Sequence, residues 1–222
     1  MENNEIMAKV DHTLLKADAS WAAIEKLCLE AVRYGAASVC IPPAYVAPVK
    51  KTFGDTLVIC TVIGFPLGYS ATEAKAAEIK QALADGAAEV DMVVNLTDVK
   101  NRDYRKITAE IRRLKDICGY RILKVIIETC YLIDEEKIAL CRCVTEGGAD
   151  YIKTSTGFGT AGATLADVAL MKAHIGAGVK IKASGGVRTR EDMIAYIQAG
   201  CDRIGASSAI TALYHEGGTD GY

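Results

Sequence analysis

The chain has 222 residues, of which 50% are hydrophobic and 24% are charged, and its net charge at pH 7 is −2. This balance is typical of a compact globular protein and provides no basic surface for nucleic acid. No apolar run approaches the roughly 18 residues of a membrane span, and the start MENNEIMAKVDHTLL lacks the pattern of a signal peptide. We therefore expect a cytoplasmic protein that contacts neither membranes nor nucleic acid.

Short apolar segments typical of β-strands recur along the chain and alternate with longer helical patterns. In chain order, the strands and the junctions that lead into them are expected within residues 6–12, 34–41, 57–64, 85–94, 121–129, 147–155, 179–185 and 199–207. The N-terminus is short, so we expect no element before the first of these strands.

Helix boundaries have their own signals. Four phrases place a glycine between a helical stretch and an apolar strand: YGAASVCI, DGAAEVDMVV, GGADYIKTS and AGCDRIGAS. Glycine is favoured there because it adopts the left-handed conformation without a Cβ clash. Helix starts are predicted by three patterns of the capping-box form: Ser70 with Glu73, Thr164 with Asp167, and Thr189 with Asp192.

Eight strands, each followed by a helix or helical turn, pair in parallel and fit a (β/α)₈ TIM barrel. We expect residues 1–222 to form this one domain, with a flexible, glycine-rich tail at 215–222. An open, doubly wound sheet is the alternative. In a barrel the active site lies at the carboxyl ends of the strands, so charged side chains there indicate chemistry.

The cysteines and histidines do not form a recognisable metal motif. The eight cysteines show no CxxC pair, and the three histidines are far apart in the sequence. We therefore expect free thiols in the core, and neither a metal site nor a cofactor.

Three of the expected strands carry charged residues at positions where a strand of a barrel usually has apolar side chains. Lys153 ends the sixth strand, Lys182 ends the seventh, and Asp91 lies within the fourth. Lys124, on the fifth strand, either joins this group or has a structural role. A second cation and burial both lower the pKa of a lysine, and a free amine attacks carbonyls to form a Schiff base. A single lysine at a strand end usually extends to water, but this combination favours catalysis.

Glycines and serines follow the last two strands, at Gly185, Gly186, Ser207 and Ser208. Loops at these positions often bind phosphate in barrels, although they can also be ordinary turns. Residues 157–162, GFGTAG, match a dinucleotide-binding pattern, but the acidic residue expected about 20 positions later is missing. A dehydrogenase is therefore the less favoured interpretation.

From about residue 6 to its end, the chain resembles the 2-deoxyribose-5-phosphate aldolase family. The matching stretches occur in the order of that family: DHTLLK (11–16), SVCIPP (38–43), EVDMVVN (89–95), LKVIIET (123–129), YIKTSTGFG (151–159) and KASGGVRT (182–189). The chain departs from some members at Phe158, where they have a lysine.

The resemblance implies reversible cleavage of 2-deoxyribose 5-phosphate to acetaldehyde and glyceraldehyde 3-phosphate, without metal or cofactor. It implies that Lys153 is the Schiff-base nucleophile and Lys182 the second lysine that lowers the pKa of its neighbour. Asp91 corresponds to the acid/base residue, and Tyr222 to a terminal tyrosine that enters the site and moves a proton. The other expected site residues are Gly157, Gly185, Gly186, Ser207 and Ser208 for the phosphate, and Lys124, Asp11, Cys40 and Thr154 in support.

Three questions stay open at the level of sequence. The assembly is a homodimer or a homotetramer, if the chain assembles. A different Schiff-base aldolase or transaldolase would act on a larger sugar phosphate. A non-catalytic barrel that binds phosphosugars would retain the phosphate loops without the chemistry.

Overall fold

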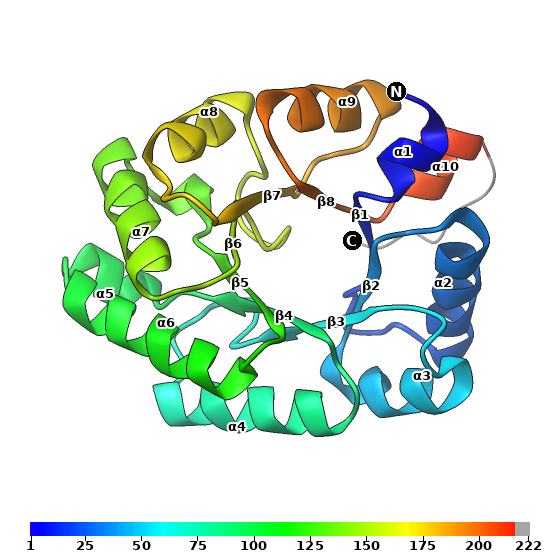
Figure 1. The fold of residues 1–222 in the computed structure, drawn as a ribbon, viewed down its shortest axis with the longest axis horizontal. Helices are drawn as coiled ribbons and strands as arrows, with labels where there is room; N and C mark the ends of the chain where they lie inside the picture. Colours follow the sequence, from blue (N-terminus) through cyan, green and yellow to red (C-terminus); the bar gives the residue numbers. More distant parts are fainter. Residues whose placement is uncertain (216–222) are drawn as a thin grey trace.

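The computed structural model describes residues 1–215; the rest of the predicted tail, Tyr222 included, lies outside the described residues. Eight strands form a closed barrel in which neighbours pair in parallel and the last strand pairs with the first (Figure 1). The strands are β1 (Val10–Thr13), β2 (Ser38–Ile41), β3 (Ile59–Ile63), β4 (Glu89–Val93), β5 (Ile122–Ile126), β6 (Tyr151–Lys153), β7 (Lys180–Ser184) and β8 (Arg203–Ala206). The predicted TIM barrel is confirmed, and the open sheet is wrong because the barrel closes.

Helices form a ring around the barrel wall (Figure 1). The α-helices are α1 (Asn3–Met7), α2 (Trp21–Tyr34), α3 (Val46–Phe53), α4 (Thr72–Ala84), α5 (Leu96–Lys100), α6 (Tyr104–Cys118), α7 (Asp134–Glu146), α8 (Leu165–His174), α9 (Arg190–Ala199) and α10 (Ala209–Tyr214). Two short 3₁₀ helices, η1 (Pro43–Tyr45) and η2 (Thr129–Tyr131), follow β2 and β5. No helix within residues 1–215 combines the length and the apolar character that crossing a bilayer demands.

Most of the predicted helix boundaries agree with the structure. Each of the four junction phrases contains a glycine with a positive φ value: 68° at Gly35, 108° at Gly86, 76° at Gly148 and 112° at Gly200. Thr164 and Thr189 are N-caps whose hydroxyls accept hydrogen bonds from the backbone amides of Asp167 and Asp192, each at 3.0 Å.

Two local predictions are wrong. Ser70 does not cap α4, because the helix begins one residue later than that pattern requires and its N-cap is Ala71. An element also precedes the first strand, because α1 includes Ile6 and Met7, which we had assigned to that strand. Both of these side chains are buried, and α1 packs against α10. The short N-terminal segment therefore covers apolar surface at the point where the barrel closes.

Alternation along the strands separates an apolar layer from a charged barrel interior. On β4, Val90 and Met92 join the main apolar core between sheet and helices, whereas Glu89 and Asp91 are buried outside that apolar cluster. The interior of this barrel is therefore not filled mainly by branched apolar side chains, as is usual in the fold.

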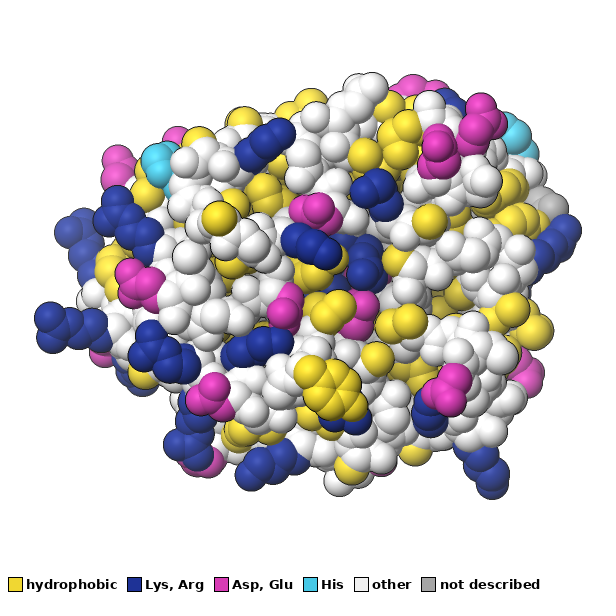
Figure 2. Space-filling view, viewed as in Figure 1, with side chains coloured by type: hydrophobic (Ala, Val, Ile, Leu, Met, Phe, Trp, Pro, Cys, Tyr) yellow, Lys and Arg dark blue, Asp and Glu magenta, His cyan; other side chains and the backbone are white. Residues whose placement is uncertain are grey.

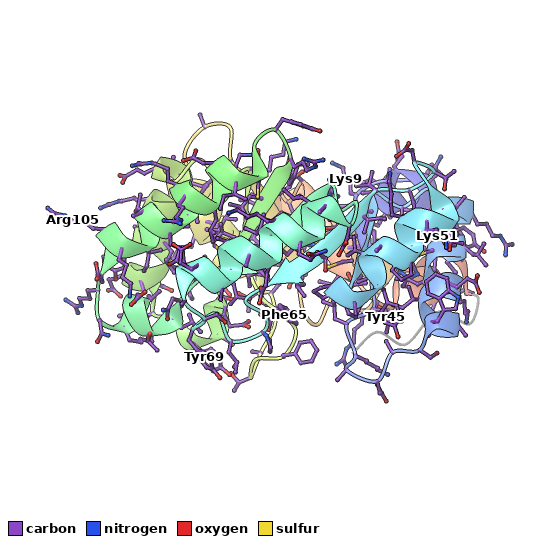
Figure 3. The ribbon with its side chains drawn as sticks, turned by 90° about the horizontal axis from the view of Figure 1, so that it is seen from below. Lys9, Tyr45, Lys51, Phe65, Tyr69 and Arg105 are labelled. Atoms are coloured by element: carbon purple, nitrogen blue, oxygen red, sulfur yellow. The ribbon has the colours of Figure 1, made fainter. Side chains whose placement is uncertain are left out.

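The two ends of the barrel are distinguished in Figure 3. Lys9, which precedes β1, lies at one edge, and Phe65 and Tyr69, which follow β3, lie at the opposite edge with Tyr45. The latter edge is the carboxyl end of the strands, which we call the barrel mouth. On the face in Figure 2, Lys and Arg side chains are mixed with Asp and Glu.

Candidate active site

The predicted lysines and aspartates meet inside the barrel. Strand pairing places Lys153 of β6 beside Lys182 of β7, and Asp91 of β4 beside Lys124 of β5. Asp11 reaches the same interior from β1. Lys182, Asp91, Lys124 and Asp11 are fully buried, and Lys153 is 2% exposed at the last position of its strand. The structure thus brings together residues that lie as many as 171 positions apart in the chain.

Asp91 is the centre of the group. Its Oδ2 accepts hydrogen bonds from Nζ of Lys153 and Nζ of Lys182, each at 2.7 Å. Its Oδ1 accepts from Nζ of Lys124 at 2.9 Å and from the thiol of Cys60 at 3.2 Å. Burial would raise the pKa of Asp91, but the three ammonium groups hold it well below its usual range. The side chain is therefore a carboxylate at neutral pH.

Lys182 has a second carboxylate partner. Its ammonium contacts Oδ2 of Asp11 as well as Asp91. Burial favours the neutral amine, yet these two carboxylates outweigh it and raise the pKa of Lys182 above its ordinary value. Lys182 therefore stays protonated beside Lys153. The expected second cation is present, but it reaches Lys153 through a shared carboxylate oxygen.

Two residues that the sequence analysis missed complete the ionic cluster. Arg203 of β8 lies 2.5 Å from Oδ1 of Asp11 and 3.2 Å from Oε2 of Glu89. Glu89 in turn lies 2.5 Å from Nζ of Lys124. Glu89 precedes Asp91 by two residues, so strand periodicity gave a usable signal for it.

The ion pairs of this cluster distinguish Lys153 from the other cationic side chains. The carboxylates of Asp11, Glu89 and Asp91 number three, and the cationic side chains of Lys124, Lys153, Lys182 and Arg203 number four. Lys124, Lys182 and Arg203 each contact two or more carboxylates, whereas the ion pairs of the described residues join Lys153 to Asp91 alone.

Lys124 also explains two groups of potential metal ligands. One group consists of Cys40, Cys60 and Asp91, and the other of Asp11, Cys60 and Glu89. Within each group the potential ligand atoms lie within 4.8 Å of one another. Nζ of Lys124 lies 3.3 Å from Cys60 Sγ and 3.5 Å from Asp11 Oδ2. Because it also contacts Glu89 and Asp91, an ammonium ion occupies the position that a bound cation would share.

The loop after β6 is fixed by two neighbouring strands. Thr154 joins β7, since its hydroxyl donates to the carbonyl of Ser184 at 3.2 Å and accepts from the Ser184 amide at 3.1 Å. Glu128, after β5, accepts from the amide of Thr156 at 3.1 Å and also from its hydroxyl. Burial raises the pKa of Glu128 despite these donors. Its φ of 52° is unusual for a residue with a side chain.

Glu128 was absent from our predicted site. The signal was available, because a charged residue at the end of strand 121–129 is the same feature that identified Lys153. Its two partners on Thr156 connect the end of β5 to the loop that carries Gly157.

The predicted phosphate residues lie on loops that approach one another. Gly185 has a φ of 81°, and a Cβ added there would lie 3.6 Å from the Cα of Gly157. Ser208 lies at the start of α10, and its hydroxyl lies 3.3 Å from the carbonyl oxygen of Arg188 in the β7 to α9 loop. The loops after β6, β7 and β8 are thus neighbours at the mouth.

Three further residues of these loops can be placed. Gly186 has a φ of 77°, and Ser207 is partly buried. Phe158 stacks edge-on against Phe65, with ring centroids 5.3 Å apart. An aromatic pair therefore stands where some aldolases carry a cation.

The GFGTAG segment has a packing explanation. A Cβ at Gly162 would approach the carbonyl oxygen of Gly185 to 2.1 Å, so glycine is required by the contact between two loops. No helix starts within residues 157–162, and α8 begins only at Leu165. The segment therefore lacks the helix N-terminus on which a dinucleotide phosphate would lie.

Comparisons with known proteins identify the family of the chain. The profile of the DeoC/LacD family aldolases matches residues 5–214. The deoxyribose-phosphate aldolase of Clostridium botulinum (strain Alaska E43 / Type E3) is 61% identical over 222 residues, covering 100% of both chains. That of Clostridioides difficile (strain 630) is 54% identical over 215 residues, covering 97% of this chain and 98% of its own.

Solved structures give the same result. The putative deoxyribose-phosphate aldolase of Coccidioides immitis has a TM-score of 0.93 at 38% identity, covering 97% of this chain and 87% of its own. The deoxyribose phosphate aldolase of Aeropyrum pernix, described as a unique tetramer, has a TM-score of 0.86 at 31% identity, covering 96% of this chain and 91% of its own.

Proposed function

The chain belongs to the DeoC/LacD family of aldolases, and from this premise we propose that it reversibly cleaves 2-deoxy-D-ribose 5-phosphate to acetaldehyde and D-glyceraldehyde 3-phosphate. The observation that carries the mechanism is the position of Lys153. Its amine ends a strand at the mouth and lies 2.7 Å from the carboxylate of Asp91. Among the cationic side chains of the described cluster, it is also the one whose ion pairs involve a single carboxylate.

The reaction begins when the amine of Lys153 attacks the aldehyde carbon of the open-chain sugar. Loss of water gives a protonated imine. A base then removes the proton of the C3 hydroxyl, the C2–C3 bond breaks, and its electron pair moves into the imine to form an enamine. Glyceraldehyde 3-phosphate leaves as the aldehyde. Protonation of the enamine and hydrolysis of the imine release acetaldehyde and restore the amine.

Asp91 is the base closest to this chemistry. Its low pKa keeps it ionised, and its Oδ2 already accepts from both Lys153 and Lys182. We assign Asp91 the proton transfers at the carbinolamine and at the C3 hydroxyl, through a bound water. Lys182 supplies the persistent positive charge that disfavours a second ammonium at Lys153. Lys124, Asp11 and Thr154 hold these groups in place, and Cys40 lies beside them on β2.

The phosphate of the substrate is assigned to the loops at the mouth. Backbone amides at Gly157, Gly185 and Gly186 and the hydroxyls of Ser207 and Ser208 offer neutral donors of the kind that bind anions. Their closeness to one another supports this assignment.

Three finer features also remain proposals. Tyr222, which lies outside the described residues, is assigned the proton transfer at C2. The test is the rate at which the methyl protons of acetaldehyde exchange with solvent deuterium in a chain that lacks Tyr222. A homodimer or homotetramer is the proposed assembly, which light scattering of the purified chain checks. A cytoplasmic location is proposed as well, and cell fractionation checks it.

The function is tested by product analysis. Wild-type protein given deoxyribose 5-phosphate should release acetaldehyde and glyceraldehyde 3-phosphate in equal amounts, and Lys153→Ala should release neither while staying folded. Lys180→Ala is the matched control, since Lys180 is an exposed lysine on β7. If the protein cleaved a larger sugar phosphate in preference to deoxyribose 5-phosphate, it would be another Schiff-base aldolase. If it bound deoxyribose 5-phosphate without turnover, it would be a non-catalytic barrel.

A further inference from the structure

Two cysteines face each other inside the barrel beside the proposed catalytic carboxylate. Cys40 of β2 and Cys60 of β3 are register partners on adjacent parallel strands, and both are fully buried. Their sulfur atoms and a carboxylate oxygen of Asp91 all lie within 4.8 Å of one another. Adjacent strands are about 4.8 Å apart, which falls inside the Cα separation of about 4.4–6.8 Å that a disulfide spans. Rotation of the side chains can therefore bring the sulfurs into bonding distance.

The two thiols differ in acidity. A hydrogen bond with Cys60 lowers the pKa of Cys40 even though burial opposes this, and Lys182 and Lys153 act in the same direction. Burial and the same hydrogen bond raise the pKa of Cys60. Cys40 is therefore the more acidic of the two thiols, although burial and the carboxylate of Asp91 oppose this.

Four other cysteines of the chain have the raised pKa values of thiols in an apolar core. Burial raises the pKa of Cys28 and Cys201 to about 12, and that of Cys118 and Cys141 to about 11. All eight cysteines are free. The pair on β2 and β3 is thus distinguished both by its geometry and by the cations around it.

The proposed path of the substrate leads toward this pair of buried cysteines. The thiol of Cys60 lies 3.2 Å from Oδ1 of Asp91, whose other oxygen lies 2.7 Å from Nζ of Lys153. Under the proposed function, an aldehyde travels from the mouth to Lys153. Hydrogen peroxide is smaller than any sugar phosphate and needs no larger opening.

We propose that Cys40 and Cys60 form a peroxide-reactive dithiol site whose oxidation to a disulfide reversibly inactivates the enzyme. The Cys40 thiolate attacks one oxygen of hydrogen peroxide, the O–O bond breaks, and hydroxide leaves and takes up a proton to become water. The resulting sulfenic acid is attacked by the sulfur of Cys60, which loses its proton. A second water leaves as the S–S bond forms, so two thiols and one peroxide give one disulfide and two waters.

Formation of the disulfide would alter the catalytic carboxylate. Cys60 currently donates to Oδ1 of Asp91 and accepts from Nζ of Lys124 at 3.3 Å. Linking its sulfur to Cys40 removes the donor and draws the sulfur away from both partners. We expect turnover to fall by about tenfold to a hundredfold, the range produced by small misplacements of catalytic groups.

The test combines peptide mapping with activity. The reduced, full-length protein is treated with increasing hydrogen peroxide, quenched with N-ethylmaleimide, digested and analysed by mass spectrometry. The expected product is a peptide pair linked through Cys40 and Cys60, which appears in step with the loss of activity. Dithiothreitol should restore both. In Cys60→Ala the linked pair should be absent, and Cys40 should proceed to sulfinic acid, so that dithiothreitol restores little activity.

Each contrary outcome overturns the proposal. These outcomes are inactivation without the linked peptides, linked peptides without inactivation, and no linkage in wild type at peroxide concentrations that oxidise the thiols of the unfolded chain. Cys130→Ser is the matched control, because Cys130 is partly exposed and lies outside the pair; it should form the linkage as wild type does. The mapping needs no turnover, so absence of aldolase activity in the reduced protein would contradict the proposed function alone.

Discussion

Lys153 and Lys182 share one oxygen of Asp91 but differ in their other partners. Lys182 also contacts Asp11, and the two carboxylates raise its pKa against the effect of burial. Lys153 lies at the strand end, where the aldehyde can approach its amine. Lys182 therefore stays protonated, and under the proposed function Lys153 is the lysine that forms the Schiff base.

Replacing the second cation should change the pH dependence of turnover. In Lys182→Leu the cluster has three cations facing three carboxylates, so the amine of Lys153 retains its proton to higher pH. We expect turnover at pH 7 to fall by about tenfold or more and to recover partly as the pH rises. A pH–rate profile measures this, with Lys180→Leu as the control. A profile of Lys182→Leu with the wild-type inflection would exclude the coupling.

Glu128 provides the second prediction at this scale. Its carboxylate accepts the amide and the hydroxyl of Thr156, which precedes the phosphate-loop residue Gly157. Glu128→Ala should release the loop and raise KM for deoxyribose 5-phosphate by about tenfold, since a buried hydrogen bond to a charged group contributes about 1.5–3 kcal/mol. Glu128→Gln keeps one acceptor and should recover part of this loss. If both variants changed kcat and left KM unaltered, Glu128 would not position the phosphate loop.

At the scale of elements, the mouth is built by loops that follow β6, β7 and β8. Ser208 lies 3.3 Å from the carbonyl oxygen of Arg188, and Gly185 packs close to Gly157. Lys172, a cation that also merits consideration for the phosphate, instead lies 3.4 Å from the carbonyl oxygen of Ala199, near the start of β8 and away from the mouth. Under the proposed function, we therefore expect the phosphate to be bound by groups on the three loops rather than by Lys172.

A negative charge on one of these loops should act selectively. Ser208→Asp should raise KM for deoxyribose 5-phosphate by about tenfold or more, because a carboxylate repels the phosphate dianion at short range. KM for unphosphorylated deoxyribose should change little. Steady-state kinetics on the two substrates provides the comparison. Equal losses on both would place the phosphate elsewhere.

The fold was largely predictable from these elements, and the site was predictable in part. Glycine junctions and Thr caps are local signals, which is why they agree with the structure. Ser70 has the same pattern and does not cap, because α4 begins one residue later than the pattern requires. Lys153 and Asp91 were identified from strand ends and alternation. The ion pair between Asp11 and Arg203 forms only because the barrel closes by pairing β1 with β8. These two residues are far apart in the sequence, so no local pattern predicts their contact.

At the scale of the whole molecule, the charged interior makes stability depend on pH at both ends of the range. Asp11 and Asp91 have lowered pKa values in the fold. Their contribution to stability is present above the ordinary value of 3.8 and is lost as the pH falls below it. Lys124 and Lys182 have raised pKa values, so their contribution is present below 10.5 and is lost as the pH rises further.

We therefore predict that the free energy of unfolding changes little from about pH 5 to pH 9 and falls on both sides. Urea unfolding at a series of pH values measures it. Asp91→Asn leaves its three lysines without their shared carboxylate and should cost about 3–5 kcal/mol at pH 7. The free energy of unfolding of Asp91→Asn should also decrease less than that of the wild type as the pH falls below 3.8. Stability of the wild type that kept rising below pH 4 would refute this account of the interior.

The central claim is that Lys153 forms the covalent intermediate, and imine trapping tests it most directly. The protein is incubated with deoxyribose 5-phosphate and sodium borohydride, digested, and the modified lysine is located by mass spectrometry. The account predicts a reduced adduct on Lys153, and none at Lys124 or Lys182 in the wild type or in Lys153→Ala. An adduct on either of those two lysines with Lys153 unmodified, or continued turnover in Lys153→Ala, would contradict it.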